Sequence, residues 1–434
     1  MSVVLFYVVM TLTFIYIIYR FRKSMLFLFI ILLFYDGYFA SFGDQVWNIY
    51  KTILPILALY CSSKYKAFTN LHNEDYIIIV SFLVFSISFQ LSAYLNDDYF
   101  TITFSQYAKY FDIFLLYFIF KKTSKLYVFT FEKLIKLIFF LLIIQIILTL
   151  FKFYAYSFYE SIVGSISFTG GAAASILPIL GFVFIWFRKK GNLTRNDWIF
   201  TLGLMFVGVV SMKRAVWFVM PIVILLFLYY VPQKRIPKNF LYAIPLIPVA
   251  FYFAVRMNPT FNKESSKWGS FDMNYVLNSS REYTFGSKES EEKGQGRGGA
   301  TLLLLDNLLH KEVDIKSLFG YGLKDMYTTD YQQFDELGFG LNHKGSATGL
   351  FQSYVSTGYI GMFITIIFVF SMLRTIKEKR IRYVMIALFC WEYILYTGSI
   401  IRNPAIGTLL VFIIALANMS FSASQVKVKL ARNN

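Results

Sequence analysis

The 434-residue sequence is poor in charged residues, cysteine and histidine, and each shortage excludes a class of protein. Only 15% of the residues are charged and 57% are hydrophobic, whereas a soluble domain is about 25% charged, so a soluble enzyme is excluded. The two cysteines, Cys61 and Cys390, lie far apart, which leaves no disulfide framework and no cysteine-based metal cluster. Because the three histidines are accompanied by no carboxylate cluster of ligand spacing, the sequence predicts neither a metal site nor a cofactor.

Long apolar runs are what the sequence has in abundance. About thirteen of them approach the roughly 20 residues that a helix needs to cross a bilayer. A helix satisfies its own backbone in hydrocarbon, and the sequence has no alternating pattern of the kind that indicates a barrel. The predicted fold class is therefore an all-α polytopic membrane protein, with transmembrane helices at residues 3–19, 25–42, 45–61, 76–95, 104–120, 133–155, 172–187, 197–212, 214–231, 239–255, 349–373, 382–400 and 404–420.

The segments between these runs alternate in charge. The acidic or neutral segments are 36–44, 96–98, 157–171 and the long stretch after Tyr252, and the basic segments are 20–23, 63–66, 121–125, 188–190, 233–235, 377–380 and 427–432. The positive-inside rule puts the basic segments and the C-terminus in the cytoplasm and the N-terminus outside. The net charge of +17 is then an orientation signal that also attracts anionic membrane lipid, and no nucleic-acid partner is expected.

One segment breaks the pattern of short connections. It divides the chain into an N-terminal bundle of about ten spans at 1–255, an external loop domain at 256–348, C-terminal helices at 349–420 and a cytoplasmic tail at 421–434. A connection of this length is usually functional. Inside it we expect two helices and a polar, glycine-rich linker, at Ala300–Leu309, Asp330–Leu337 and Ser287–Gly299 respectively.

Several lysines and arginines lie in segments that the positive-inside rule places outside, where it does not account for positive charge. Lys213 and Arg214 occupy a tight external turn, Arg402 lies in another, and Arg281 and Arg297 belong to the loop domain, as does Arg256. A guanidinium costs roughly 2.5–3.5 kcal/mol at mid-bilayer and less at the interface. Arg214 and Arg402 either extend to lipid headgroups or bind an anion, and the planar fork of arginine suits a diphosphate held at the membrane surface. A polyprenyl diphosphate presents such a group.

Four ionisable groups in or beside apolar runs are also candidates for functional residues. Lys109 and Asp112 are spaced i, i+3 and are predicted to neutralise each other within the bundle. Glu392 could relay protons, which is the prediction for a transporter. His310, after a leucine-rich helix, is predicted to interact with that helix's C-terminal dipole.

Three stretches lie in order within and around the external loop domain. The first is Ser211-Met212-Lys213-Arg214-Ala215, a Ser-Arg-small turn that enters a span. The second is Gly296-Arg297, then an amphipathic helix and Leu318-Phe319-Gly320-Tyr321-Gly322. The third is Asn342-His343-Lys344-Gly345, followed by Leu350-Phe351-Gln352-Ser353-Tyr354 and Gly358-Tyr359-Ile360-Gly361. Together they resemble the O-antigen polymerase and ligase superfamily, which includes Wzy-type polymerases and lipopolysaccharide O-antigen ligases.

The resemblance implies a GT-C-like fold in the bacterial inner membrane and an inverting, metal-independent glycosyl transfer on its outer side. The donor would be a polyprenyl-diphosphate-linked oligosaccharide, whose diphosphate Arg214 and Arg297 would hold. His343 would orient or deprotonate the acceptor hydroxyl, or Asp325, Asp330, Asp335 or Glu336 would do so in its place. Further contacts to diphosphate or glycan would come from Lys213, Arg281, Arg402 and Tyr321, and a chain-length regulator would be a possible protein partner.

Several functions remain open at this point. A repeat-unit polymerase of O-antigen or capsule and a ligase that moves finished glycan to another acceptor share this chemistry. A flippase for the same lipid-linked glycan predicts duplicated blocks of spans and no large external domain, and a receptor or scaffold leaves the external arginines without a function.

Overall fold

The computed structural model describes the whole chain except residues 1–2, 23, 157–162, 168–170, 212, 231–250, 253–254, 257–261, 265–267, 286–296, 311–312, 323–347 and 433–434. The described part is built from helices and contains no strand, only an isolated β-bridge between Val163 and Ser167. The predicted all-α fold is confirmed for this part of the chain.

Helices occupy the apolar runs that hydropathy picks out, apart from 239–255, most of which lies outside the described residues. In chain order they are α1 (Val3–Phe21), α2 (Met25–Phe34), α3 (Asp36–Ala40), α4 (Asp44–Lys64), α5 (Asn73–Leu95), α6 (Phe100–Leu126), α7 (Val128–Tyr156), α8 (Gly171–Arg188), α9 (Arg195–Val210), α10 (Arg214–Tyr230), α18 (Gly349–Arg374), α19 (Lys379–Leu395), α20 (Ser399–Arg402) and α21 (Pro404–Arg432). Two predicted runs are broken: 25–42 at Tyr35, and 382–400 after Leu395.

Four helices in the described part, α1, α5, α7 and α18, are long and apolar enough to cross a membrane. Shorter apolar helices accompany them, at Met25–Phe34, Ala172–Arg188, Ala215–Tyr229 and Pro404–Met419. The surface of α5 is typical of a helix that contacts lipid, because one face buries aromatic side chains and the opposite face exposes Ile77, Val80, Leu83 and Ile87. These helices support a membrane protein, while the count of about thirteen spans stays a prediction.

The centre of the bundle is formed by helices that are apolar on every side. In α21 the residues from Ala405 to Ala417 are almost entirely buried, and α8 is buried in the same way from Ile176 to Trp186. A helix that is hydrophobic all round belongs in the interior of a bundle. Accordingly α21 packs against α6, α8 and α2, and α18 packs along α5.

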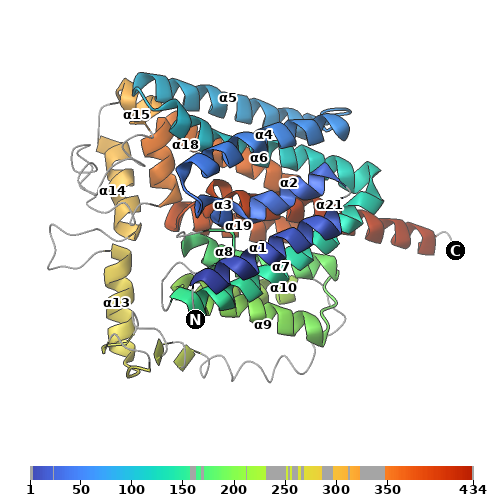
Figure 1. The fold of residues 1–434 in the computed structure, drawn as a ribbon. Helices are drawn as coiled ribbons and strands as arrows, with labels where there is room; N and C mark the ends of the chain where they lie inside the picture. The colour runs from blue at the N-terminus through green and yellow to red at the C-terminus, as the bar shows by residue number, and fades with distance from the viewer. Residues whose placement is uncertain are drawn as a thin grey trace.

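The helices of the loop domain lie across one end of this bundle (Figure 1). They are α13 (Met273–Phe285), α14 (Arg297–His310) and α15 (Ile315–Phe319), and the last turns of α21 leave from the other end. We call the end of the bundle that the loop-domain helices cover the loop-domain end. We call the other end the lysine-rich end, because α6 ends there with Lys121, Lys122 and Lys125.

Predictions for the loop domain were only partly right. The helix predicted at Ala300–Leu309 is confirmed as α14, but the linker predicted through Gly299 is wrong at its end, because α14 already begins at Arg297. Helix α13 was not predicted, since its sequence is polar and has no apolar run. The helix predicted at Asp330–Leu337 lies outside the described residues.

Candidate functional site

Helix α14 is attached to the bundle at a corner between α19 and α20. The hydroxyl of Thr301, in the second turn of α14, donates to the carbonyl of Ile394 at 3.1 Å. The N–H of Gly349, the first residue of α18, donates to the carbonyl of Tyr396 at 2.9 Å. The start of α14, which carries Arg297, therefore lies one turn from the place where α14, α18 and α19 meet.

The corner itself depends on a glycine contact and a buried carboxylate. Gly398 has φ of 66°, and a Cβ on Gly349 would lie 2.5 Å from the Gly398 Cα, so the two backbones touch. The fully buried side chain of Glu392 accepts hydrogen bonds of 3.4 Å from the Thr397 hydroxyl and from the Ile400 N–H. Glu392 thus holds the chain reversal between α19 and α20, a role that the proton-relay interpretation did not include.

Helix α10 brings the second arginine to the same end. It follows α9 through a tight turn in which the Lys213 N–H donates to the Gly208 carbonyl at 3.0 Å. A Cβ on Gly208 would lie 2.3 Å from Val216, so only glycine permits α9 and α10 to approach so closely. Helix α10, which begins at Arg214 directly after Lys213, packs against α19 as well as against α8 and α9.

Arg402 ends α20 and is half-buried. Helix α20 packs against α6 and α8, and Arg402 lies within electrostatic range of Lys109 on α6 and of Tyr393 on α19. Helices α10, α14 and α20, each of which has an arginine at its start or end, thus all pack against α19. The side chains of Arg214 and Arg297 are outside what the structure describes, so their direction is not stated.

A buried polar cluster lies below this corner. The Lys51 side chain is 1% exposed and forms an ion pair of 2.6 Å with Asp36. Lys109 donates to Gln106 Oε1 at 2.8 Å. The predicted Lys109–Asp112 pair is wrong, because Lys109 is satisfied one turn back along α6 while Asp112 lies within electrostatic range of Lys51 and keeps one carboxylate oxygen without a hydrogen-bond partner.

Lys51 was missed by the sequence analysis, because a single lysine does not lower the hydropathy of the run 45–61 enough to interrupt it. A charged residue in the middle of a predicted span was the available signal.

Replacing Lys51 with methionine should destabilise the protein by roughly 3–5 kcal/mol, because it leaves the carboxylate of Asp36, only 14% exposed, without its ion-pair partner. Thermal unfolding of the purified protein in detergent measures the change. Lys64→Met, an exposed lysine at the end of the same helix, is the control and should change stability little. Adding Asp36→Asn to Lys51→Met should restore part of the loss, and no restoration would contradict the pairing argument.

The second and third resemblance stretches are in direct contact. Helix α18 is kinked at Gly358, which has φ of 65° and ψ of −167°. A Cβ there would lie 2.3 Å from the carbonyl carbon of Leu318 in α15, and a Cβ on Gly320 would lie 2.6 Å from the Thr357 nitrogen. The glycines of both stretches therefore allow two backbones to touch.

Polar side chains at the end of α5 donate hydrogen bonds to backbone carbonyls beside the kink. The Ser92 hydroxyl donates to the Ser356 carbonyl at 2.7 Å, and the Asn96 side chain donates to the Gly320 carbonyl at 3.1 Å. Tyr321, between these glycines, donates its N–H to the Val355 carbonyl at 2.7 Å and packs its ring edge-on against Tyr354. Burial raises the pKa of the Tyr321 phenol, which keeps it neutral. Its predicted contact with glycan stays a prediction.

The remaining candidates are placed differently. Arg281 is exposed on α13, which packs against α14. Arg256 is held by local structure, since its Nε donates to the Gly269 carbonyl at 3.0 Å and its guanidinium lies over the Trp268 ring. His310 contacts Asp306 in the last turn of α14. His343 and its alternatives Asp325, Asp330, Asp335 and Glu336 lie outside the described residues.

Comparison with known proteins finds neither a family model nor a curated relative that matches this chain. The likeness to O-antigen polymerases and ligases therefore rests on the three stretches quoted above, two of which the structure brings into contact.

Proposed function

We propose that the protein is a polysaccharide repeat-unit polymerase of the bacterial inner membrane. It transfers glycan from a polyprenyl-diphosphate donor to a lipid-linked glycan acceptor on the outer side, with the loop-domain end outside and the C-terminus in the cytoplasm. One observation carries the proposal: α10, α14 and α20, which bear Arg214, Arg297 and Arg402 at their ends, all pack against α19.

The proposed glycosyl transfer requires cations next to the diphosphate leaving group. The acceptor hydroxyl attacks the anomeric carbon from the face opposite the diphosphate, and the bond between that carbon and the diphosphate oxygen breaks with inversion. The electron pair leaves with the polyprenyl diphosphate, and the hydroxyl proton passes to a base, for which His343 is the candidate. Cations fixed near the departing oxygen stabilise the transition state more than the ground state.

The position of two of these arginines at helix N-termini strengthens the attraction of their charge for an anion. Arg214 and Arg297 are the first residues of α10 and α14, where unpaired N–H groups and the helix dipole favour an anion. A guanidinium grips two phosphate oxygens in parallel, which a lysine cannot do. Lys213 precedes Arg214 and adds a further positive charge to the same turn. Together these groups would neutralise a diphosphate at the membrane surface.

Deleting the gene and separating the surface glycan on a gel tests the proposal. A polymerase predicts that the ladder collapses to a single repeat unit and that the wild-type gene restores it. Polymer that is full length but remains on its lipid carrier would assign the chain to the ligases instead. An unchanged ladder would overturn both, and loss of all surface glycan with single units trapped on the cytoplasmic side would indicate a flippase.

A further inference from the structure

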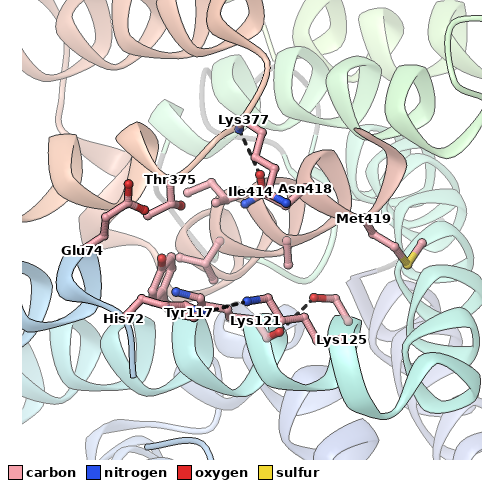
Figure 2. Close-up of a pocket in the computed structure, with 13 residues that line it drawn as sticks. His72, Glu74, Tyr117, Lys121, Lys125, Thr375, Lys377, Ile414, Asn418 and Met419 are labelled. Atoms are coloured by element: carbon pink, nitrogen blue, oxygen red, sulfur yellow. Dashed lines mark hydrogen bonds between the residues drawn. The ribbon is translucent and has the colours of Figure 1, made fainter. Parts of the chain in front are cut away.

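A cavity of about 460 Å³ opens at the lysine-rich end, opposite the proposed catalytic corner (Figure 2). Its walls come from the start of α5, the end of α6, the turn after α18 and the middle of α21. A smaller neighbouring cavity of about 200 Å³ shares His72, Lys121 and Lys125 with it. These segments include basic connections that the charge pattern assigns to the cytoplasmic side.

Positive charge dominates the polar wall of this cavity. Lys121, Lys125 and Lys377 line it together with one carboxylate, Glu74, and Figure 2 shows Lys377 across the cavity from the two lysines of α6. Lys121 is paired with Asp75, which lies outside the wall of the larger cavity. Lys125 has the ring nitrogen Nε2 of His72 at 3.5 Å. The wall of the larger cavity therefore carries more ammonium groups than carboxylates.

Burial lowers the pKa of the Lys125 ammonium, and the neighbouring Lys121, Lys377 and Lys122 lower it further, while Asp75 acts in the opposite direction. An anion in the cavity would relieve the repulsion among these lysines.

The wall formed by α21 is mainly apolar. It is lined by Val411, Ile414, Ala415 and Met419 and by one polar residue, Asn418, which Figure 2 shows beside Ile414. Val411, Ile414 and Ala415 are buried. Contact with an apolar wall does not stabilise a small soluble anion. It does stabilise an amphipathic anion, because the phosphate can contact the lysines while the hydrocarbon lies along α21.

We propose that this cavity binds the phosphate of an anionic phospholipid, with the glycerol and the first part of an acyl chain along α21. The walls include the end of α6 and the turn after α18, which the charge pattern assigns to the cytoplasmic side, and a lipid held there would fix these two helix ends relative to the middle of α21. The proposal does not depend on the glycosyl transfer proposed above, and its test uses binding and stability instead of transfer.

The test uses the full chain purified in neutral detergent, with thermal unfolding followed as phosphatidylglycerol or phosphatidylcholine is added in mixed micelles. Phosphatidylglycerol should raise the midpoint by several degrees and phosphatidylcholine should not, since a ligand that binds only the folded state stabilises it. Lys125→Gln should lose at least half of this shift. Lys64→Gln removes the same charge from the exposed end of α4, outside the cavity, and should keep the shift.

Three results would overturn the proposal. They are equal shifts with the two lipids, an equal loss of the shift in Lys64→Gln, and full protection by glycerol phosphate without lipid, which would assign the cavity to a soluble anion. Native mass spectrometry of the lipid that copurifies provides a second measurement that needs no thermal unfolding. The wild-type chain should retain phosphatidylglycerol that Lys125→Gln does not, and equal retention would also contradict the site.

Discussion

Replacing Arg214 with alanine is expected to reduce glycan transfer by roughly 10²–10³-fold, which is what removal of one fixed donor to a developing anion costs an enzyme. Arg214 begins α10, and that helix packs against α19, as α14 also does. In the proposed reaction, removing the guanidinium takes away charge that the departing diphosphate needs in the transition state. The measurement is the rate of polymer formation by the purified protein from a lipid-linked repeat unit.

Further variants separate charge from geometry. Arg297→Ala should act like Arg214→Ala, and Arg214→Lys should recover part of the rate because it restores the charge without the two-pronged contact. Arg195→Ala is the matched control, since Arg195 is also the first residue of a helix but is exposed and follows the basic segment 188–190. Full activity of both alanine variants at the corner, with the protein folded, would refute the proposed transferase.

Replacing Gly358 with alanine is expected to destabilise the protein by roughly 3–5 kcal/mol, the sum of two independent costs. The backbone at Gly358 has a positive φ and an extended ψ, a conformation that is essentially restricted to glycine. The new methyl group would also lie 2.3 Å from the backbone of Leu318, so α15 must move away from α18. The unfolding midpoint of the purified variant in detergent measures this loss.

Gly43→Ala separates the two costs. Gly43 also has a positive φ, of 94°, but a Cβ there would meet no atom within 4 Å, so this variant carries the backbone strain without the contact. We expect the loss at Gly358 to exceed the loss at Gly43 by roughly 1–3 kcal/mol, the usual cost of forcing an extra methyl group into packed structure. Equal losses would mean that α15 can leave the kink at no cost, and the contact between the two glycine-rich stretches would not hold the loop domain in place.

The glycine-rich stretches show how a motif and its structural role are related. From the sequence, Leu318–Gly322 and Gly358–Gly361 are similar to two stretches of a known superfamily, and nothing in their spacing indicates that they touch. In the structure the Ser92 hydroxyl of α5 and the side chain of Asn96, directly after α5, donate hydrogen bonds to backbone carbonyls in and beside the two stretches where they touch. The glycines are therefore explained by close backbone packing, which positions the loop domain over the end of the bundle.

Buried charges were the least predictable part of the candidate site. Spacing of i, i+3 suggested that Lys109 and Asp112 pair, but the energy of a buried ion pair depends on every neighbouring helix and not on one helix alone. Lys51 on α4 and Asp36 before it in the chain meet because α3 folds back on α4. The first helix of the apolar run 25–42 ends at Tyr35, and the chain then reverses between α3 and α4 at residues 41–43, where Gly43 has φ of 94°.

Composition and hydropathy by themselves determined that the chain is helical, that it is apolar enough for membrane helices, and which arginines and lysines require an explanation. These are local properties, because twenty consecutive apolar residues satisfy their own backbone in a helix wherever that helix is packed. Only the tertiary structure decided which residues and helices meet: that Gly349 touches Gly398, that α10 and α14 both pack against α19, and that α6 and α21 enclose a lysine-lined cavity. Contacts between helices far apart in the chain depend on small residues and on single hydrogen bonds, and no periodic pattern along the sequence records them.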